Sequence, residues 1–172
     1  MKTIFLAWVL LLNLSPAWAC SCVEERISEK AKIAKARAQA SLVFTGCVTA
    51  AEVVEMTDTA HLRARAGQDT VVTTRQQYRR YTFAVIRQLK GHSAATSVVV
   101  FTAGPGSSCG VSYRVGAELV VFAYMVDAAD NLRGGTKKIP PYFVTGLCTR
   151  TKDLRSTKPA ELRQLKRLAH QG

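Results

Sequence analysis

Residues 78–89 of the chain read YRRYTFAVIRQL. Tyr81, Phe83 and Val85 fall on every second position of this stretch, which places them on one face of an extended chain. Aromatic and β-branched residues at this spacing are typical of a β-strand that covers a hydrophobic core with one face. The stretch therefore predicts a strand over Tyr78–Leu89 and a fold built mainly from β-sheet.

Four further segments predict strands: Leu42–Ala50, Ser97–Thr102, Glu118–Val126 and Tyr142–Thr149. The second and third of these are continuous apolar runs, which are typical of strands buried on both faces. Turn signals lie between the strands, at Lys90-Gly91-His92, Gly104-Pro105-Gly106, Asn131 to Gly135 and Pro140-Pro141. Five short strands predict a small closed or partly open β-barrel.

A long polar insertion, Glu52–Gln77, separates the first two strands. It is rich in threonine and carries arginines. An insertion of this length is either a β-ribbon or a mobile loop, and the residues favour neither.

Two segments predict helices that flank the strands. Glu24–Ala40 is rich in helix-forming residues, with an apolar face expected at Ile27, Ala31 and Ala34. Ser156–Gln171 has Pro159 in its first turn. Its apolar stripe consists of Leu162, Leu165, Leu168 and Ala169. Its basic flank, which we expect to be solvated surface, consists of Arg163, Lys166 and Arg167.

The first residues predict a cleaved signal peptide over residues 1–19. Lys2 is followed by the apolar run Ile4–Leu14 and by Ala17-Trp18-Ala19, which provides small residues two positions apart. The run is too short to span a bilayer, which takes about 20 apolar residues. We therefore expect no transmembrane span and one mature domain, residues 20–172, that is secreted, extracellular or periplasmic.

The chain carries a formal net charge of +12, with 48% hydrophobic and 21% charged residues. This composition argues against general disorder. The positive charge favours a polyanion or an anionic surface as a partner. One basic stripe is predicted around the insertion, formed by Arg63, Arg65, Arg75, Arg79, Arg80, Arg87 and Lys90.

All five cysteines lie after the predicted leader, where an oxidising compartment allows disulfides. Five cysteines allow fifteen frameworks of two bridges, so their number does not choose one. We expect Cys20 and Cys22 each to bridge to a distant partner, because neighbouring side chains on an extended segment point apart. Cys47 lies within an apolar predicted strand and is expected to be a buried, inert thiol.

Four features together resemble one family: Cys20-Ser21-Cys22 at the predicted cleavage site, Tyr81–Ile86 running into Leu89-Lys90-Gly91, Phe101–Val111 with Ser108-Cys109-Gly110, and Thr145-Gly146-Leu147-Cys148. In order and spacing they are similar to the N-terminal inhibitory domain of the tissue inhibitors of metalloproteinases, and they cover most of residues 20–150. The wider netrin-like module group shares much of this pattern without inhibiting proteases.

The resemblance implies a five-stranded OB-fold barrel with flanking α-helices and the bridges Cys20–Cys109 and Cys22–Cys148, which leave Cys47 as a free thiol. It implies that the α-amino group and carbonyl of Cys20 chelate the catalytic zinc of a target metalloprotease. The inhibitory wedge would comprise Ser21, Cys22, Ser107, Ser108, Cys109 and Gly110. The zinc belongs to the protease, so no cofactor or intrinsic metal site is expected. The chain departs from the family because it lacks a further early cysteine and a C-terminal subdomain, which puts potency and target choice in question.

Other interpretations compete with inhibition. His61, His92 and His170 form no recognisable catalytic or metal-ligand arrangement, so we expect no enzyme. A cysteine directly after the leader is also where lipoproteins are acylated, and a lipid anchor on Cys20 would tether the chain to the cell envelope and block zinc chelation. A third alternative is a non-inhibitory OB module that binds polyanions through the basic stripe.

Overall fold

The computed structural model describes residues 22–23, 25–63, 69–91, 95–107, 109–130 and 136–170. Its elements are, in chain order, α2 (Glu29–Gln39), β1 (Leu42–Arg63), β2 (Asp69–Lys90), β3 (Ser97–Ala103), β4 (Glu118–Asp130), β5 (Thr136–Val144), β6 (Lys152–Asp153) and α3 (Pro159–Ala169). The predicted signal peptide lies outside the described residues. The prediction of a mainly β protein with flanking helices is confirmed.

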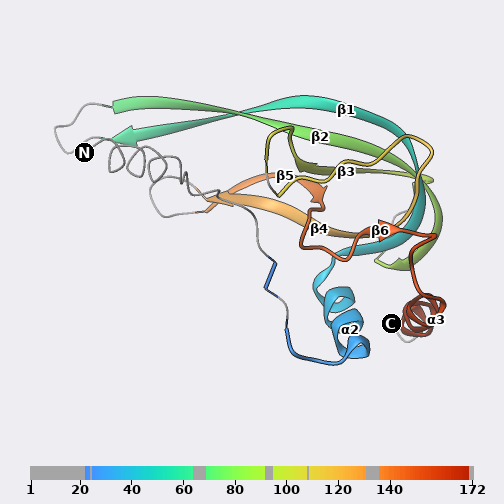
Figure 1. The fold of residues 1–172 in the computed structure, drawn as a ribbon. Coiled ribbons are helices and arrows are strands. Elements are labelled where there is room, and N and C mark those ends of the chain that lie inside the picture. The colour runs from blue at the N-terminus through green and yellow to red at the C-terminus, as the bar shows by residue number, and fades with distance from the viewer. Residues whose placement is uncertain are drawn as a thin grey trace, which may run out of the picture.

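One six-stranded sheet organises the molecule, in the order β1-β2-β3-β5-β4-β6 (Figure 1). An additional pairing of β1 with β4 joins the sheet back on itself, so that five strands form a ring. Within this sheet the β3–β5 pairing is parallel, while the other strand pairs are antiparallel. The sixth strand, β6, is a two-residue addition to the edge of β4 that the sequence patterns did not predict.

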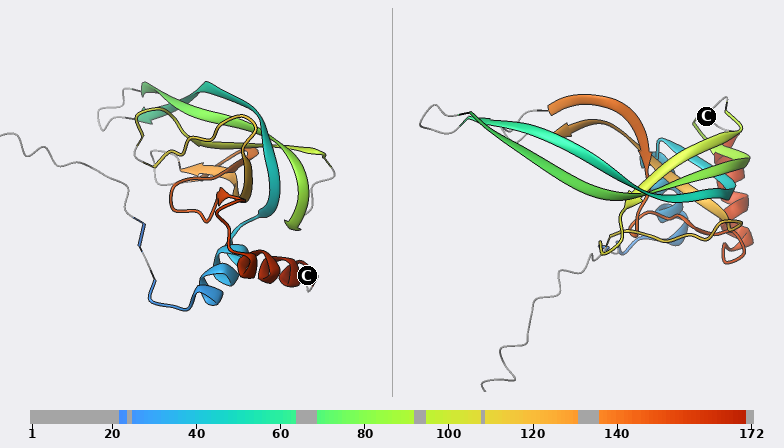
Figure 2. Two further views of the ribbon diagram at one scale, coloured as in Figure 1. Left: turned by 45° about the vertical axis from the view of Figure 1, so that its right-hand side comes forward. Right: turned by 90° about the horizontal axis from the view of Figure 1, so that it is seen from above.

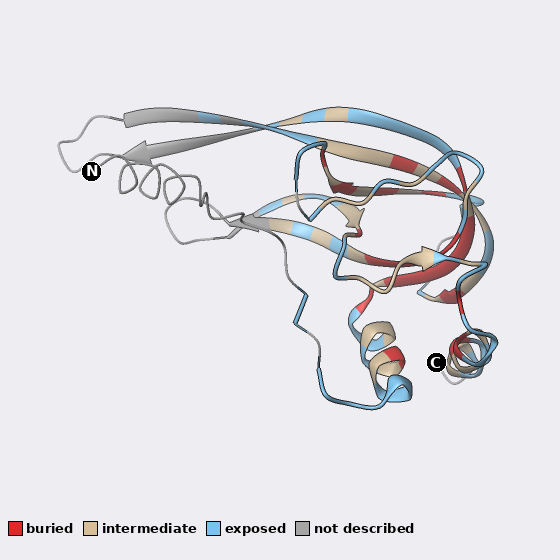
Figure 3. Ribbon diagram, viewed as in Figure 1, coloured by how far each residue is buried: buried red, intermediate tan, exposed pale blue. Residues whose placement is uncertain are grey.

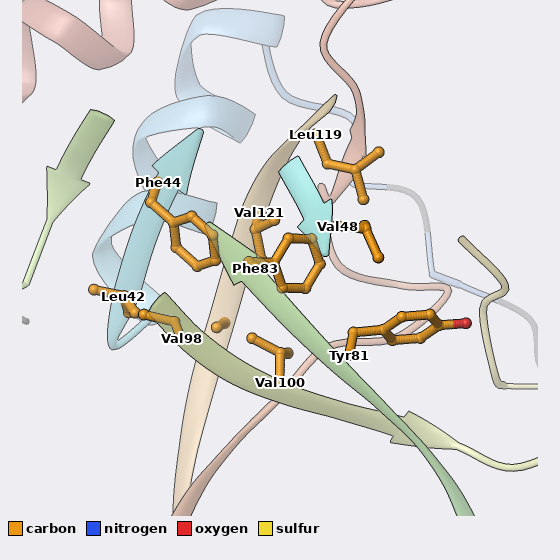
Figure 4. Close-up of a cluster of buried hydrophobic side chains, with 10 residues drawn as sticks. Leu42, Phe44, Val48, Tyr81, Phe83, Val98, Val100, Leu119 and Val121 are labelled. Carbon is orange, nitrogen blue, oxygen red and sulfur yellow. The ribbon is translucent and has the colours of Figure 1, made fainter. Parts of the chain in front are cut away.

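The interior of the ring holds a cluster of apolar side chains that we call the ring core. Its members are Leu42, Phe44, Val48, Tyr81, Phe83, Val98, Val100, Leu119, Val121 and Ala123. Figure 4 shows these side chains directed toward one another from four strands. The rings of Phe44 and Phe83 meet edge to face at a centroid distance of 5.6 Å. Tyr81 and Phe83 point inward together and Val85 packs against them, which confirms the predicted apolar face of β2.

A second cluster, the helix-side core, lies on the other face of β1 and β4. It consists of Ile33, Ala40, Val43, Leu89, Val120, Phe122 and Leu165. Successive residues at the start of β4, 119–123, enter the two cores alternately, so this part of the strand is buried on both faces, as predicted (Figure 3). β3 differs from the same prediction, because only Val98, Val100 and Thr102 are buried and the residues between them are partly exposed.

The C-terminal helix α3 confirms the predicted stripe, with Leu165 fully buried and Leu162 packed against the same core. The prediction for α2 was wrong in two respects. The helix begins at Glu29 rather than Glu24, because the Ser28 side chain caps it by accepting a hydrogen bond from the backbone N–H of Ala31 at 3.3 Å. Its buried residue is Ile33, whereas Ile27 precedes the helix and is 41% exposed.

β1 and β2 are paired from Val43↔Lys90 to Arg63↔Asp69. The described part of the insertion Glu52–Gln77 therefore continues both strands as an antiparallel ribbon. Figure 2 shows this ribbon extending away from the rest of the sheet and from both helices. The described part of the insertion is therefore a β-ribbon, which was one of the two predicted alternatives.

The expected turn at Pro140-Pro141 was wrong, and of the expected strand Tyr142–Thr149 only residues 142–144 lie in a strand. Both prolines lie inside β5, where the register with β4 shifts between Val126 and Ala128. Extra residues in β5 bulge at this shift, so the ladder needs no N–H from either proline. β5 ends at Val144, and the chain turns before it reaches Cys148.

Candidate functional site: the disulfide-linked edge

The candidate site begins at the first described residues. Cys22 is disulfide-bonded to Cys148 with a Cα–Cα distance of 5.3 Å and a sequence separation of 126 residues. This is the pairing that the resemblance implies. Both cysteines are exposed. Cys20 and Ser21 lie outside the described residues. The described part of the site therefore starts with the bridge that joins Cys22 to the turn after β5.

The loop between β3 and β4 is held tightly against the sheet by its glycines. A Cβ atom on Gly104 would lie 2.2 Å from the carbonyl oxygen of Gln77, and one on Gly110 would lie 2.4 Å from that of Ala103. Such distances are too short for any side chain. Gly106 has φ +83°, a backbone conformation that glycine adopts without strain. The loop is therefore built for one close-packed conformation.

Hydrogen bonds inside this loop position Cys109. The hydroxyl of Ser107 accepts from the backbone N–H of Cys109 at 3.3 Å, and the carbonyl of Ser107 accepts from the N–H of Gly110 at 3.3 Å. Cys109 is exposed and disulfide-bonded. Its implied partner, Cys20, and the predicted wedge residue Ser108 lie outside the described residues.

The turn that carries Cys148 lies directly beside the loop that carries Cys109. The backbone N–H of Leu147 donates to the carbonyl of Cys109 at 3.2 Å, and a Cβ on Gly146 would be 3.3 Å from the same oxygen. Leu147 is 48% exposed and Val23 is 92% exposed. The structure thus brings Cys22, Cys109 and Cys148 together at one exposed edge, which we call the disulfide-linked edge.

A cluster of three threonines, which the sequence patterns did not predict, connects this edge to β4. The Thr145 hydroxyl lies 2.9 Å from the Thr149 hydroxyl and 2.8 Å from the Thr151 hydroxyl. Thr151 also accepts from the backbone N–H of Phe122 at 2.9 Å, which ties the turn to β4. The sequence signal for this cluster was a threonine at each of these three positions around Cys148. Two of the positions lie in the predicted strand Tyr142–Thr149, and the third follows it.

Charged groups attach the chain after Cys148 to both helices. Arg150 donates to Glu29 of α2 at 2.5 Å and to Glu161 of α3 at 3.2 Å, and Lys152 donates to Glu161 at 2.6 Å. Glu161 is only 4% exposed, so its charge depends on these two cations. The hydrogen bond and the charge of Arg150 lower the pKa of Glu29.

Two tyrosines anchor the segment that follows Cys109. The Tyr81 hydroxyl accepts from the backbone N–H of Tyr113 at 3.1 Å and lies 3.4 Å from the carbonyl of Val111. Burial raises the pKa of Tyr113 to about 12. Val111 also donates its N–H to the hydroxyl of Thr102 at 3.3 Å. These bonds connect the loop to the ring core.

Two cations of the predicted basic stripe form ion pairs on the ribbon. Arg80 pairs with Glu52 at 2.7 Å and Arg75 with Glu55 at 3.6 Å, each across the strand pair. Arg79 donates to the Ser112 hydroxyl at 2.6 Å. The side chains of Arg63 and Arg65 lie outside the described residues.

At the other end of β2, Lys90 donates to the carbonyls of Ala38 at 2.7 Å and Ala40 at 2.5 Å. Burial and the nearby charge of Arg37 lower the Lys90 pKa. Lys90 therefore fastens β2 to the end of α2, and Arg87 is the exposed cation of this part of the predicted stripe.

The remaining candidate residues are scattered. Cys47 is a free cysteine, partly buried in β1, with its thiol 3.8 Å from the carbonyl of Val48. His170 is exposed at the end of α3, while the side chains of His61 and His92 lie outside the described residues. In the described part of the chain, no group of His, Cys, Asp and Glu could hold a metal ion.

No protein-family model matches the chain, and no curated protein matches it. Within the described residues, no helix is both long and apolar enough to cross a membrane. The protein is a mainly β, disulfide-bonded chain in which Cys22, Cys109 and Cys148 meet at one exposed edge.

Proposed function

We propose that the mature chain is a secreted inhibitor of zinc metalloproteases, similar to the inhibitory domain of the tissue inhibitors of metalloproteinases. The observation that carries the proposal is the Cys22–Cys148 bridge lying beside the hydrogen-bonded Cys109 loop. Cleavage after residue 19 would leave Cys20 as the first residue, two positions from this bridge. The ring of five strands would then correspond to the OB-fold barrel of that family.

The proposed chemistry uses the chain terminus itself. The α-amino nitrogen and the carbonyl oxygen of Cys20 would displace the water from the open position of the target's catalytic zinc and chelate the zinc as a five-coordinate centre. An α-amino group has a pKa of about 7.7–8.0, so its deprotonation at neutral pH costs little. Ser21 would enter the first specificity pocket of the protease. The zinc belongs to the target, and the inhibitor needs no cofactor.

Rigidity of the disulfide-linked edge supports this role. A wedge of Ser21, Cys22, Ser107, Ser108, Cys109 and Gly110 would be held by the implied Cys20–Cys109 bridge and by the hydrogen bonds of Ser107. A preorganised segment loses little conformational entropy on binding. The exposed side chains of Val23 and Leu147 would add apolar contact at its border.

A single added residue tests the proposal. One alanine placed before Cys20 would move the free amine away from the zinc while leaving every disulfide in place. We expect the mature protein to inhibit at least one member of a panel of zinc metalloproteases, measured with fluorogenic peptides, and the extended protein to be weaker by about 100-fold, or about 2.7 kcal/mol. An alanine added after Gly172 is the matched control and should change nothing.

Intact mass and the N-terminal residue of the unreduced protein should be recorded first. A free amine on Cys20 and a mass short by four hydrogens are expected if two bridges form. A lipid adduct on Cys20, or equal inhibition by the extended protein, would contradict the zinc-chelating mechanism. An adduct would instead support the envelope lipoprotein alternative.

A further inference from the structure

Positive charge is concentrated on the two helices rather than on the ribbon. Residues 25–40 and 155–170 contain ten Lys and Arg against three Glu, a net +7 of the chain's +12. The ribbon segments 51–63 and 69–80 contain four Arg against four Asp and Glu, so their net charge is zero. These two segments, which comprise α2, α3 and the residues beside them, therefore hold more than half of the net charge that would attract a polyanion.

Many of these helical cations are exposed and unneutralised. The exposed ones that make no ion pair with a described residue are Arg26, Lys30, Arg155, Lys158, Arg163, Lys166 and Arg167. By contrast, each glutamate of these segments is paired. Glu25 pairs with Lys35, Glu29 pairs with Arg150, and Glu161 pairs with both Arg150 and Lys152. All three glutamates thus pair with cations of the protein itself.

The two helices contact each other. The side-chain amide of Gln164 donates to the carbonyl of Lys30 at 2.8 Å, which places the first turn of α2 against the middle of α3. Both helices lie on the same side of the sheet, away from the extended ribbon (Figures 1 and 2). On α3, positions 163, 166 and 167 share the face opposite the buried Leu165. We call the surface that carries Lys30 of α2 and Arg163, Lys166 and Arg167 of α3 the helical basic face.

We infer that the helical basic face binds an acidic polysaccharide. The face offers fixed cations with no aromatic residue in either segment, so it lacks the stacking platform that single-stranded nucleic acids use. None of the exposed large apolar side chains in the described residues lies within α2 or α3. An interfacial helix that inserts into a membrane needs such side chains. A linear polymer of sulfates or carboxylates requires neither feature.

A pair of triple variants tests the inference. Arg163→Gln, Lys166→Gln and Arg167→Gln remove three charges from the helical basic face, and Arg75→Gln, Arg79→Gln and Arg80→Gln remove three from the ribbon. The binding of fluorescein-labelled heparin oligosaccharide to the mature protein is followed by anisotropy at several salt concentrations. At about 0.15 M salt we expect the helix variant to lose at least tenfold in affinity and its log–log salt dependence to flatten by about two units. The ribbon variant should lose less than about threefold.

Competition identifies the ligand class. Polygalacturonate and heparin should each displace the labelled oligosaccharide at lower charge concentration than single-stranded DNA or anionic phospholipid vesicles. Better competition by DNA or by vesicles would overturn the assignment to polysaccharide. Equal losses in the two triple variants would overturn the assignment to the helical basic face, because they would show dependence on net charge alone. Thermal unfolding of both variants confirms that each is folded in the assay.

Discussion

Replacing both Cys22 and Cys148 with serine removes the bridge that joins the first described residues to the turn after β5. The bridge closes a loop with a sequence separation of 126 residues. In the chain-entropy model, a loop of this length stabilises the folded state by about 5 kcal/mol at 25 °C. Since single domains are stable by only about 5–15 kcal/mol, the substitution should remove a large share of the total.

The measurement is guanidinium unfolding, followed by circular dichroism without reductant. Both proteins should carry Cys47→Ser, because the free thiol of Cys47 could otherwise exchange with the remaining bridge. Cys47→Ser alone should change stability by less than about 1 kcal/mol, since the thiol is only partly buried and makes one weak contact.

The expected result is a free energy of unfolding lower by about 3–5 kcal/mol, with the lower end allowing for structure that persists in the unfolded chain. A loss below about 1 kcal/mol at unchanged dependence on denaturant would refute the reasoning. It would mean that the bridge restricts the unfolded chain far less than the chain-entropy model assumes.

Three further predictions concern single residues. Glu161→Gln should destabilise the protein by about 2 kcal/mol in chemical unfolding, below the range for fully buried pairs because its two cations are partly exposed; an unchanged midpoint would contradict this. Gly110→Ala should cost about 1–3 kcal/mol by the same measurement, because its Cβ would meet the Ala103 carbonyl at 2.4 Å. The unfolded chain releases the Tyr113 proton near pH 10 and the folded chain near pH 12, so stability should fall as the pH rises through this window. Tyr113→Phe should make that fall shallower, and an identical pH profile would count against the burial argument.

Local patterns were reliable where one element faces a core. The two-residue spacing of Tyr81, Phe83 and Val85 predicted both the strand and its buried face. The leucine stripe of α3 predicted the helix and the burial of Leu165. Both predictions succeeded because the side-chain period of an element is a local property of the backbone.

Patterns failed where tertiary contacts, or in one case a local helix cap, overrode the preference that composition indicated. Pro140 and Pro141 indicated a turn, yet they lie within β5, where a register shift removes the need for their N–H groups. Helix-forming residues suggested that α2 begins at Glu24, whereas the cap at Ser28 sets its start. The three threonines around Cys148 are visible in the sequence, but only the fold shows that their hydroxyls lie within hydrogen-bonding distance of one another.

The amino-acid sequence alone established the mainly β class, the position of the amphipathic C-terminal helix and the excess of positive charge, because composition and local periodicity encode these properties directly. The tertiary structure decided how β1 meets β4 to join five strands in a ring, that the described part of the insertion is a ribbon, and that Arg75 and Arg80 of the ribbon pair with glutamates of the neighbouring strand. These features depend on backbone ladders and ion pairs between residues distant in the chain, and no local pattern specifies which partner a strand edge or a charge will meet.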